Sequence, residues 1–447
     1  MAKKHAAKSN GKNGNTKSRR KVPRGVAMES FLIHGSHFTD KWDFRHHIIP
    51  PISSSVTYRL DTTERGTRGF QEYASGKATR KNPVYIYDRL DEPTRGMLED
   101  ELAGVEGGDC CVAFATGMAA VSAALGVLLN AGDDLIAHKT LYGCTYNLIT
   151  RWYPRLNIGS KLIDLNNTKL LQKTITPRTR VVYFETPVNP TMELIDIGAI
   201  RKVLDAVNAR RKPEERIRIV VDSTFATPYC QRPLELGADL VVHSLTKNIG
   251  GFGTDMGGAV IAGAELEGQL LLYRKDFGGA LAPKSAWPIL VYGLPTLPLR
   301  LKRQIETAYQ VARFLRSHPK VARVCYPGLE DHPQYELAKR QMRDLHGEFA
   351  PGNMIYFETV EHAPGHSENC IKVVDWIAKH AYALTLAVSL GQLRTLIENP
   401  GAMTHAAVPP EERIKGGIAP NGIRLSIGVE DPKDLIHDLE QGLAIAD

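Results

Sequence analysis

The feature that most constrains the fold of this chain is the alternation of short apolar runs with helical patterns from residue 93 onward. Strands that repeat with helices between them predict a mostly parallel sheet covered on both faces, which is an α/β architecture. Right-handed crossovers would bring the loops at the carboxyl ends of the strands to one edge, where functional residues gather. The strand-like runs are 111–115, 134–137, 181–185, 217–222, 240–244 and 258–262.

A Pro-rich segment at 283–298 interrupts this pattern and precedes a mixed C-terminal region. Ser367 and Asp434 are residue types that cap helix N-termini, so we expect helices to begin at these two positions. The helical patterns of the whole chain are 94–105, 117–129, 196–209, 300–318, 367–380 and 434–446, with C-terminal strands at 354–359 and 423–427.

The chain has 447 residues, more than one hydrophobic core usually contains, so we predict two domains with additional segments. Pro50, Pro51 and Pro83 interrupt an irregular, extended region that we expect to contact a neighbouring subunit. The predicted division is a basic disordered arm at 1–30, this extended segment at 31–92, a large domain at 93–295 and a smaller α+β domain at 296–447.

The net charge of +7 belongs to the N-terminal arm. Residues 1–24 contain nine Lys or Arg and no acid, so subtracting nine from +7 leaves −2 for the rest of the chain. A basic arm of this composition predicts a solvated, disordered tail, with polyanion binding as the alternative. No run approaches the roughly 18 apolar residues of a membrane span. We therefore expect a cytoplasmic protein that binds neither nucleic acid nor membrane.

The cysteine and histidine pattern predicts no metal site. None of the six cysteines forms a C-x-x-C pair, so neither a zinc knuckle nor a redox motif is indicated. His46 and His47 are adjacent, and adjacent side chains point in different directions, which argues against joint ligation.

Lys247 and Asp222 carry the strongest chemical signal in the sequence. Lys247 closely follows the strand-like run 240–244, and Asp222 ends the run 217–222. Partial burial lowers the pKa of a lysine and favours the neutral amine, and a buried carboxylate needs a partner. Pyridoxal phosphate requires one amine to hold its aldehyde and one carboxylate to keep its ring nitrogen protonated. The pair therefore predicts a pyridoxal-phosphate site, although Asp222 as a turn or N-cap residue remains an alternative.

Other residues at strand ends suit the same cofactor. Ser244 and Thr246 carry hydroxyls that can bind a phosphate, and the helix that opens at Gly117 and Met118 offers free N–H groups. Tyr142 could stack on a flat ring or simply pack. The remaining candidates are Asn189, which could contact the cofactor or form a turn, Arg424, a charge within an apolar strand pattern that could hold a carboxylate, and Tyr87 and Arg89, which could reach a phosphate across a subunit boundary.

Together these strings resemble the Cys/Met-metabolism family of pyridoxal-phosphate enzymes from about residue 31 to the C-terminus. The resemblance implies the type I aminotransferase-like fold and a homotetramer built as a dimer of dimers with shared active sites. It implies that Lys247 holds the cofactor covalently, that Asp222 pairs with the ring nitrogen and that Tyr142 stacks and transfers protons. It further implies phosphate contacts from Gly117, Met118, Ser244 and Thr246, joined by Tyr87 and Arg89 of a neighbouring subunit, a cofactor contact from Asn189, and substrate-carboxylate binding by Ser389 and Arg424.

Within the family, the chain resembles the methionine γ-lyase branch. Cys144 stands where most members have glycine and this branch has cysteine, and Lys275-Asp276 resembles its substrate-region pair. The alternative is that Cys144 is a packing residue and the pair a solvated turn. The resemblance implies α,γ-elimination from a sulfur amino acid, a small-molecule substrate, to give a thiol, 2-oxobutyrate and ammonia.

Three departures from the family pattern leave the substrate open. Glu92 replaces an asparagine, Asn248 replaces an aromatic residue, and Arg394 stands where γ-lyases have glutamate and homoserine-ester sulfhydrylases have a basic residue. Met403-Thr404-His405 resembles the lyase and synthase branches. Cystathionine γ-lyase, cystathionine γ-synthase and O-acetylhomoserine sulfhydrylase activities therefore remain alternatives.

Overall fold

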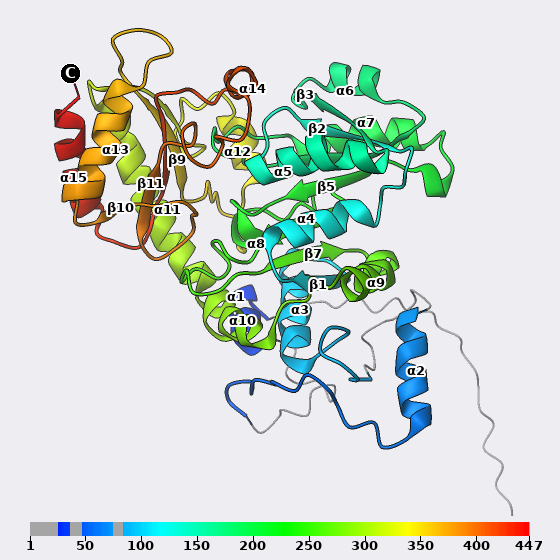
Figure 1. Ribbon diagram of the computed structural model, residues 1–447. Helices are drawn as coiled ribbons and strands as arrows, with labels where there is room; N and C mark the ends of the chain where they lie inside the picture. Colours follow the sequence, from blue (N-terminus) through cyan, green and yellow to red (C-terminus); the bar gives the residue numbers. More distant parts are fainter. Residues whose placement is uncertain (1–25, 36–46, 75–83, 447) are drawn as a thin grey trace, which may run out of the picture.

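The computed structural model describes residues 26–35, 47–74 and 84–446 (Figure 1). Most of the basic arm and His46 lie outside the described residues. Among the helices of the described part, none combines the length and apolar character that a membrane crossing requires.

The larger of two sheets has the strand order β1-β7-β6-β5-β4-β2-β3. Strands β3, β2, β4, β5 and β6 pair in parallel, and β7 runs antiparallel to both β6 and β1. The prediction of a mostly parallel sheet is confirmed, and β3 is a strand that the sequence pattern did not indicate. The strands are β1 (Cys110–Phe114), β2 (Asp134–His138), β3 (Gly159–Ile163), β4 (Thr179–Glu185), β5 (Arg218–Asp222), β6 (Leu240–Ser244) and β7 (Gly258–Ala262).

Helices cover both faces of this sheet because successive strand residues point to opposite sides. In β4, Val181 and Tyr183 join one apolar cluster, and Val182 and Phe184 join another. The first face packs against α4 (Gly117–Gly126), α5 (Gly143–Asn147) and α9 (Glu267–Phe277). The second packs against α3 (Pro93–Glu106), α6 (Thr168–Thr174), α7 (Ile197–Asn208) and α10 (Pro283–Pro288).

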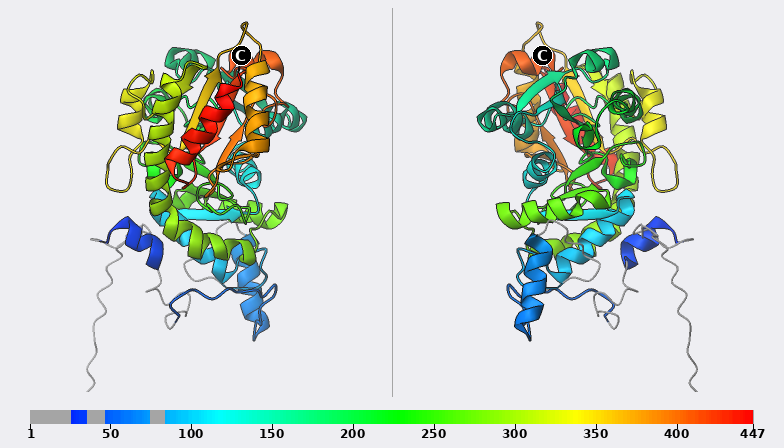
Figure 2. Two further views of the ribbon diagram at one scale, coloured as in Figure 1. Left: turned by 90° about the vertical axis from the view of Figure 1, so that its left-hand side faces the viewer. Right: turned by 90° about the vertical axis from the view of Figure 1, so that its right-hand side faces the viewer.

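A second, smaller sheet has the order β10-β11-β12-β9-β8 and lies beside the first (Figures 1 and 2). Its outer face packs on α11 (Leu294–Ser317), α13 (Glu368–His380) and α15 (Pro432–Ala444). Its residues Met354 and Tyr356 cluster with Met192 and Phe225 of the larger sheet's loops. The strands are β8 (Val321–Cys325), β9 (Met354–Thr359), β10 (Leu384–Leu386), β11 (Thr395–Glu398) and β12 (Gly422–Ser426), so the predicted smaller α+β unit is confirmed.

The N-terminal segment differs from the irregular region predicted for residues 31–92. It contains α1 (Met28–His34) and α2 (Thr63–Ala74), and α2 projects from the body of the molecule (Figures 1 and 2). The scattered prolines suggested an irregular chain, but α2 lies between them. Three further short α-helices are α8 (Thr227–Cys230), α12 (Tyr335–Gln341) and α14 (Pro410–Lys415).

Two predicted helix starts were wrong. Helix α11 begins at Leu294 rather than near residue 300: Pro295 lies in its first turn, where proline is tolerated, and Pro298 lies inside the helix. Helix α15 is capped by Asp431, whose side chain accepts a hydrogen bond from the Lys433 N–H, and Asp434 lies within the helix. Ser367 occupies the N-cap position of α13, but the carboxylate of Glu361 accepts from the free helix N–H groups instead.

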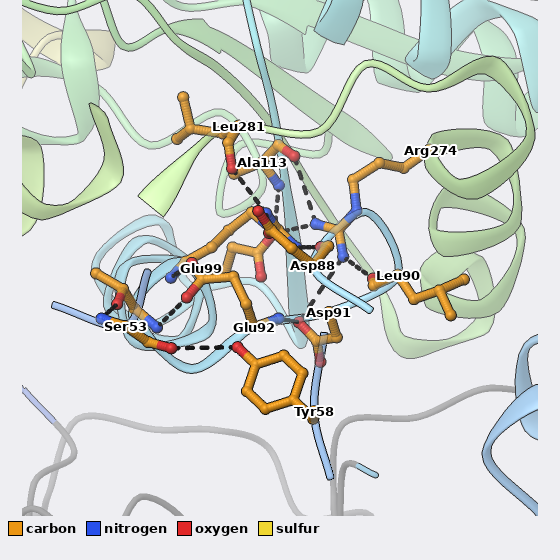
Figure 3. A network of polar contacts seen from close by, with 12 residues as sticks. Ser53, Tyr58, Asp88, Leu90, Asp91, Glu92, Glu99, Ala113, Arg274 and Leu281 are labelled. Atoms are coloured by element: carbon orange, nitrogen blue, oxygen red, sulfur yellow. Dashed lines mark hydrogen bonds and ion pairs between the residues drawn. The ribbon is translucent and has the colours of Figure 1, made fainter. Parts of the chain in front are cut away.

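A buried ionic network attaches the segment before α3 to the large sheet (Figure 3). Arg274 of α9 donates to Glu99 of α3 at 2.6 Å and to the Leu90 carbonyl at 2.7 Å, and both ionic side chains are fully buried. Arg95 donates to Asp88 at 2.9 Å. The network therefore fixes residues 88–91 against α3, α9 and β1.

Glu92, one of the departures from the family pattern, caps α3 beside this network. Its carboxylate accepts from the Thr94 N–H at 2.8 Å and from the Arg95 N–H. Burial raises the pKa of Glu92 to about 7. The glutamate therefore replaces an ordinary N-cap residue at this position.

Replacing Arg274 by methionine should destabilise the protein by about 3–5 kcal/mol, because Glu99 would lose its buried counter-ion. The matched control is Arg340→Met, which removes a largely exposed pair with Asp196 and should change stability by less than about 1 kcal/mol. Urea denaturation of both variants measures the difference. Equal stabilities would show that the Arg274 network does not anchor the fold.

Candidate active site

A cavity of about 300 Å³ opens at the carboxyl ends of β4, β5 and β6, next to the start of α4 and the loops of the second sheet. Parallel strands place their carboxyl ends at one edge, so residues distant in sequence meet there. The predicted residues that line this cavity are Gly117, Met118, Tyr142, Asn189, Asp222, Ser244, Thr246, Lys247, Ser389 and Arg424.

The amine of Lys247 lies at the boundary between the two sheets. Its Nζ donates a hydrogen bond to Ser389 Oγ at 2.7 Å. Burial, followed by the positive charge of Arg424, lowers the pKa of Lys247 to about 8. About a tenth of this amine is therefore neutral and nucleophilic at pH 7, and the fraction rises as the pH approaches 8.

Two carboxylates end neighbouring strands at the floor of the cavity. Asp222 accepts from the Thr224 N–H at 3.0 Å and from the Tyr183 hydroxyl at 3.4 Å, and burial raises its pKa. Glu185 lies opposite Asp222 in the β4–β5 register, and burial, then Asp222, raises its pKa to about 8. The sequence analysis missed Glu185, although it ends a strand as Asp222 does.

The start of α4 forms a cradle against the end of β6. Thr116 caps the helix by accepting from the Ala119 N–H at 3.0 Å, which leaves the first N–H groups without intrahelical acceptors. A Cβ added at Gly117 would lie 2.8 Å from the Cβ of Ser244, so only glycine allows this approach. Backbone donors, a helix N-terminus and the hydroxyls of Ser244 and Thr246 suit a phosphate.

Arg424 forms the opposite wall of the cavity and is almost fully buried. It donates to the Asn189 side-chain oxygen at 3.1 Å and to the Ser389 carbonyl at 2.7 Å. Glu398, a second residue that the sequence analysis missed, lies 3.0 Å from the Arg424 guanidinium. Burial lowers the pKa of Arg424, but a guanidinium retains its charge at physiological pH.

Tyr142 and Cys144 lie together at the rim. Tyr142 lines the cavity, and the Cys144 thiol donates to its hydroxyl at 3.5 Å. Burial raises the pKa of the Tyr142 phenol, so the phenol remains protonated at neutral pH. Cys144 itself does not line the cavity. Its thiol contacts the hydroxyl of Tyr142, which does.

Four predicted site residues lie away from the cavity, on an exposed part of the same chain. Arg89 donates to the Lys275 carbonyl, its guanidinium lies 5.6 Å from the Tyr87 ring centre, and Lys275 pairs with Asp276 at 3.2 Å. The sequence analysis expected Tyr87 and Arg89 to act in a neighbouring subunit. Within the single chain, Lys275 contacts Arg89 and pairs with Asp276, so these two residues also lie outside the cavity.

The two other departures from the family pattern lie in different environments. Asn248 is fully buried and exchanges amide hydrogen bonds of 3.3 and 3.1 Å with Asn353 at the start of β9. Gly391, with φ +76°, packs against Asn248 so closely that a Cβ would lie 2.3 Å from its backbone nitrogen. Arg394 is exposed and does not line the cavity.

These residues fit pyridoxal phosphate at both ends of the molecule. The glycine-dependent cradle at Gly117 and Ser244 matches its phosphate. The carboxylate of Asp222, whose pKa burial raises, would regain a charged partner in a protonated ring nitrogen. The nucleophilic amine of Lys247 lies in the same cavity and matches the aldehyde.

The rate at which cofactor-free protein binds pyridoxal phosphate covalently should rise about tenfold per pH unit below pH 8 and level off above it. The reason is that only neutral Lys247 reacts, and its pKa is about 8. Stopped-flow absorbance of the yellow product measures this rate. Lys247→Ala should abolish the yellow absorbance and turnover, whereas Lys139→Ala, a control lysine directly after β2, should retain both. A yellow, active Lys247→Ala variant would contradict the assignment.

The chain is similar to known proteins over nearly its whole length. The model of the Cys/Met metabolism PLP-dependent enzyme family matches residues 29–444. An L-methionine gamma-lyase of Fusobacterium nucleatum subsp. polymorphum is 40% identical over 395 residues, which cover 88% of this chain and 92% of that protein. A cystathionine gamma-lyase of Bacillus subtilis is 37% identical over 360 residues, 80% of this chain and 88% of that protein.

The fold agrees with these similarities. The crystal structure of cystathionine gamma-lyase from Lactobacillus plantarum, complexed with L-serine, has a TM-score of 0.81, with 33% identity over 94% of this chain and 99% of that chain. The predicted type I aminotransferase-like fold is thereby confirmed, and so is pyridoxal phosphate as the cofactor of the family. The chain belongs to the Cys/Met metabolism family of pyridoxal-phosphate-dependent enzymes.

Proposed function

We propose that the protein is a carbon–sulfur lyase that eliminates the γ-thiol of a sulfur-containing L-amino acid, giving a thiol, 2-oxobutyrate and ammonia. The observation that carries the proposal is the 2.7 Å hydrogen bond between Lys247 Nζ and Ser389 Oγ, with Arg424 bonded to the Ser389 carbonyl. This arrangement places the reactive amine next to a carboxylate-binding pair. An α-amino acid whose carboxylate binds Arg424 presents its Cα to Lys247.

The residues of the chain have the protonation states that elimination needs. Pyridoxal phosphate, when bound, supplies an electron-accepting ring that makes the Cα proton of the substrate acidic. Lys247, with a pKa of about 8, is suited to accept the Cα proton and to move it. Tyr142 keeps its phenolic proton because burial raises its pKa, so it can protonate the departing sulfur. Asp222 would pair with the positive charge of the protonated ring nitrogen.

Methionine is the substrate that we favour. Several L-methionine gamma-lyases are 36–40% identical to the chain, and Cys144 contacts the proposed proton donor Tyr142. Arg394, which suggested a homoserine-ester sulfhydrylase, is exposed and away from the cavity. A cavity of about 300 Å³ fits a small-molecule substrate.

We also propose the cytoplasm as the compartment of this enzyme.

We also propose that each active site is completed by a second copy of the chain, in a homotetramer. Arg89 and Tyr87 are exposed and lie outside the cavity of their own chain; Arg89 contacts both Lys275 and the Tyr87 ring. The ionic network of Arg95 and Asp88 holds this segment firmly. We infer that Tyr87, Arg89, Lys275 and Asp276 reach the cavity of the partner subunit.

Purified enzyme should convert methionine to 2-oxobutyrate faster than it converts cystathionine, and O-acetylhomoserine with sulfide should yield little homocysteine. Separate assays of 2-oxobutyrate and homocysteine with each substrate measure the order. Cystathionine turnover exceeding methionine turnover would favour cystathionine γ-lyase, and homocysteine as the main product would favour a sulfhydrylase. Both of these results would contradict methionine as the substrate.

Hybrids of Arg89→Ala and Lys247→Ala subunits should recover about a quarter of the wild-type activity, although each variant alone is impaired. Random pairing makes half of the dimers hybrid, and one of the two sites in each hybrid is intact if Arg89 acts across the boundary. Co-expression with two purification tags, followed by activity assays, measures the recovery.

The control pairs Lys247→Ala with Asp222→Ala. Both residues line the cavity of a single chain, so every hybrid site keeps one defect and no activity should return. If the Arg89 hybrid recovers no more than this control, Arg89 does not act in the partner's site.

A further inference from the structure

Arg424 already has a buried counter-ion before any substrate binds. Glu398 of β11 and Arg424 of β12 face each other in the antiparallel register, and their charged atoms are 3.0 Å apart. The side chain of Arg424 is only 3% exposed, and that of Glu398 is only 2% exposed. The guanidinium of Arg424, which in the proposed function binds the substrate carboxylate, is therefore already paired with the carboxylate of Glu398.

One oxygen of Glu398 is well supplied with donors and the other is not. Its Oε1 accepts from Thr404 Oγ1 at 2.7 Å and forms the ion pair with Arg424 at 3.0 Å. Its Oε2 is buried and has no hydrogen-bond partner within residues 26–35, 47–74 and 84–446. A carboxylate with one unsatisfied buried oxygen is poorly stabilised in its charged form.

The groups around Glu398 are few and come from four elements. Arg424 belongs to β12, Lys247 follows β6, Tyr142 precedes α5, and His405 follows Thr404 in the loop after β11. Burial raises the pKa of Glu398, and Arg424, Thr404 and Lys247 partly oppose this rise. Burial lowers the pKa of His405 to about 4, so this histidine adds no positive charge at neutral pH.

We propose that Glu398 takes up a proton when the α-carboxylate of the substrate binds Arg424, and that it thereby sets the pH dependence of substrate affinity. Two negative carboxylates sharing one buried guanidinium repel each other, and protonating one of them removes the repulsion. The proton comes from solvent on binding and returns to solvent when the product leaves. The inference rests on the proposed function, in which Arg424 receives this carboxylate.

The sign of the effect follows from this coupling. Below the pKa of Glu398 the residue is already neutral and carboxylate binding is strongest. Above this pKa, binding must add a proton, so affinity falls by up to about tenfold per pH unit. A glutamine at position 398 keeps an oxygen for Thr404 and Arg424 but cannot ionise, so it should remove this fall.

The test uses holoenzyme and 4-(methylsulfanyl)butanoate, a carboxylate that lacks an amine and therefore cannot react with Lys247 or the cofactor. Isothermal titration calorimetry in buffers of different ionisation enthalpy, between pH 6 and 9, counts the protons bound with the probe. We expect the wild type to approach about one proton per probe at the higher pH values. Glu398→Gln should take up at least several-fold fewer protons and bind the probe more tightly there.

Glu358→Gln is the matched control. Glu358 lies on β9 of the same sheet, its pKa is also raised by burial, and it pairs with Arg323 at 3.5 Å, outside the cavity. This variant should behave as the wild type does. As a second measurement, Glu398→Gln should have a lower KM for the amino-acid substrate than the wild type above neutral pH.

Two failures can be told apart. Equal proton uptake and equal pH dependence of KM in the wild type and Glu398→Gln would overturn the role of Glu398 while leaving the proposed function intact. If Arg424→Lys binds the probe as well as the wild type does, Arg424 is not the carboxylate site, and the proposed substrate geometry fails together with the inference.

Discussion

The hydrogen bond between Lys247 and Ser389 is the contact on which the chemistry of this protein depends, because it joins the two sheets at the reactive amine. The lysine follows β6 of the large sheet, and the serine lies in the loop that leads to β11 of the small one. The amide pair of Asn248 and Asn353 holds the same boundary one residue further along. A change in the relative position of the sheets would therefore alter the amine and the carboxylate-binding pair together.

Buried charge is organised differently in the scaffold and in the site. In the scaffold, Arg274 and Glu99 form a buried ion pair that ties α9 to α3. In the site, burial raises the pKa values of Asp222 and Glu185, two carboxylates at adjoining strand ends. The Arg274–Glu99 pair lies wholly within the chain, whereas the two carboxylates of the cavity suit a cationic ligand. Such unbalanced groups are the usual mark of functional sites.

The sequence predicted much of the fold because local patterns carry it. The β-branched runs at β4, β5 and β6 have the length and apolar character of buried parallel strands, and these strands lie where they were expected. Helix ends were less predictable, since proline near the start of α11 is compatible with its first turn and since Glu361, from outside the helix, replaces Ser367 as the cap of α13.

The sequence by itself determined that Asp222 ends one strand, that Lys247 closely follows another and that Gly117 opens a helix, because these depend on residues close in the chain. Only the tertiary structure decided that Ser389 meets Lys247 across 142 residues, that Glu398 neutralises Arg424, and that Arg89 faces away from the cavity of its own chain. The physical reason is that hydrophobic periodicity encodes which face of an element is buried. The partners of a polar side chain depend instead on how whole elements pack against one another.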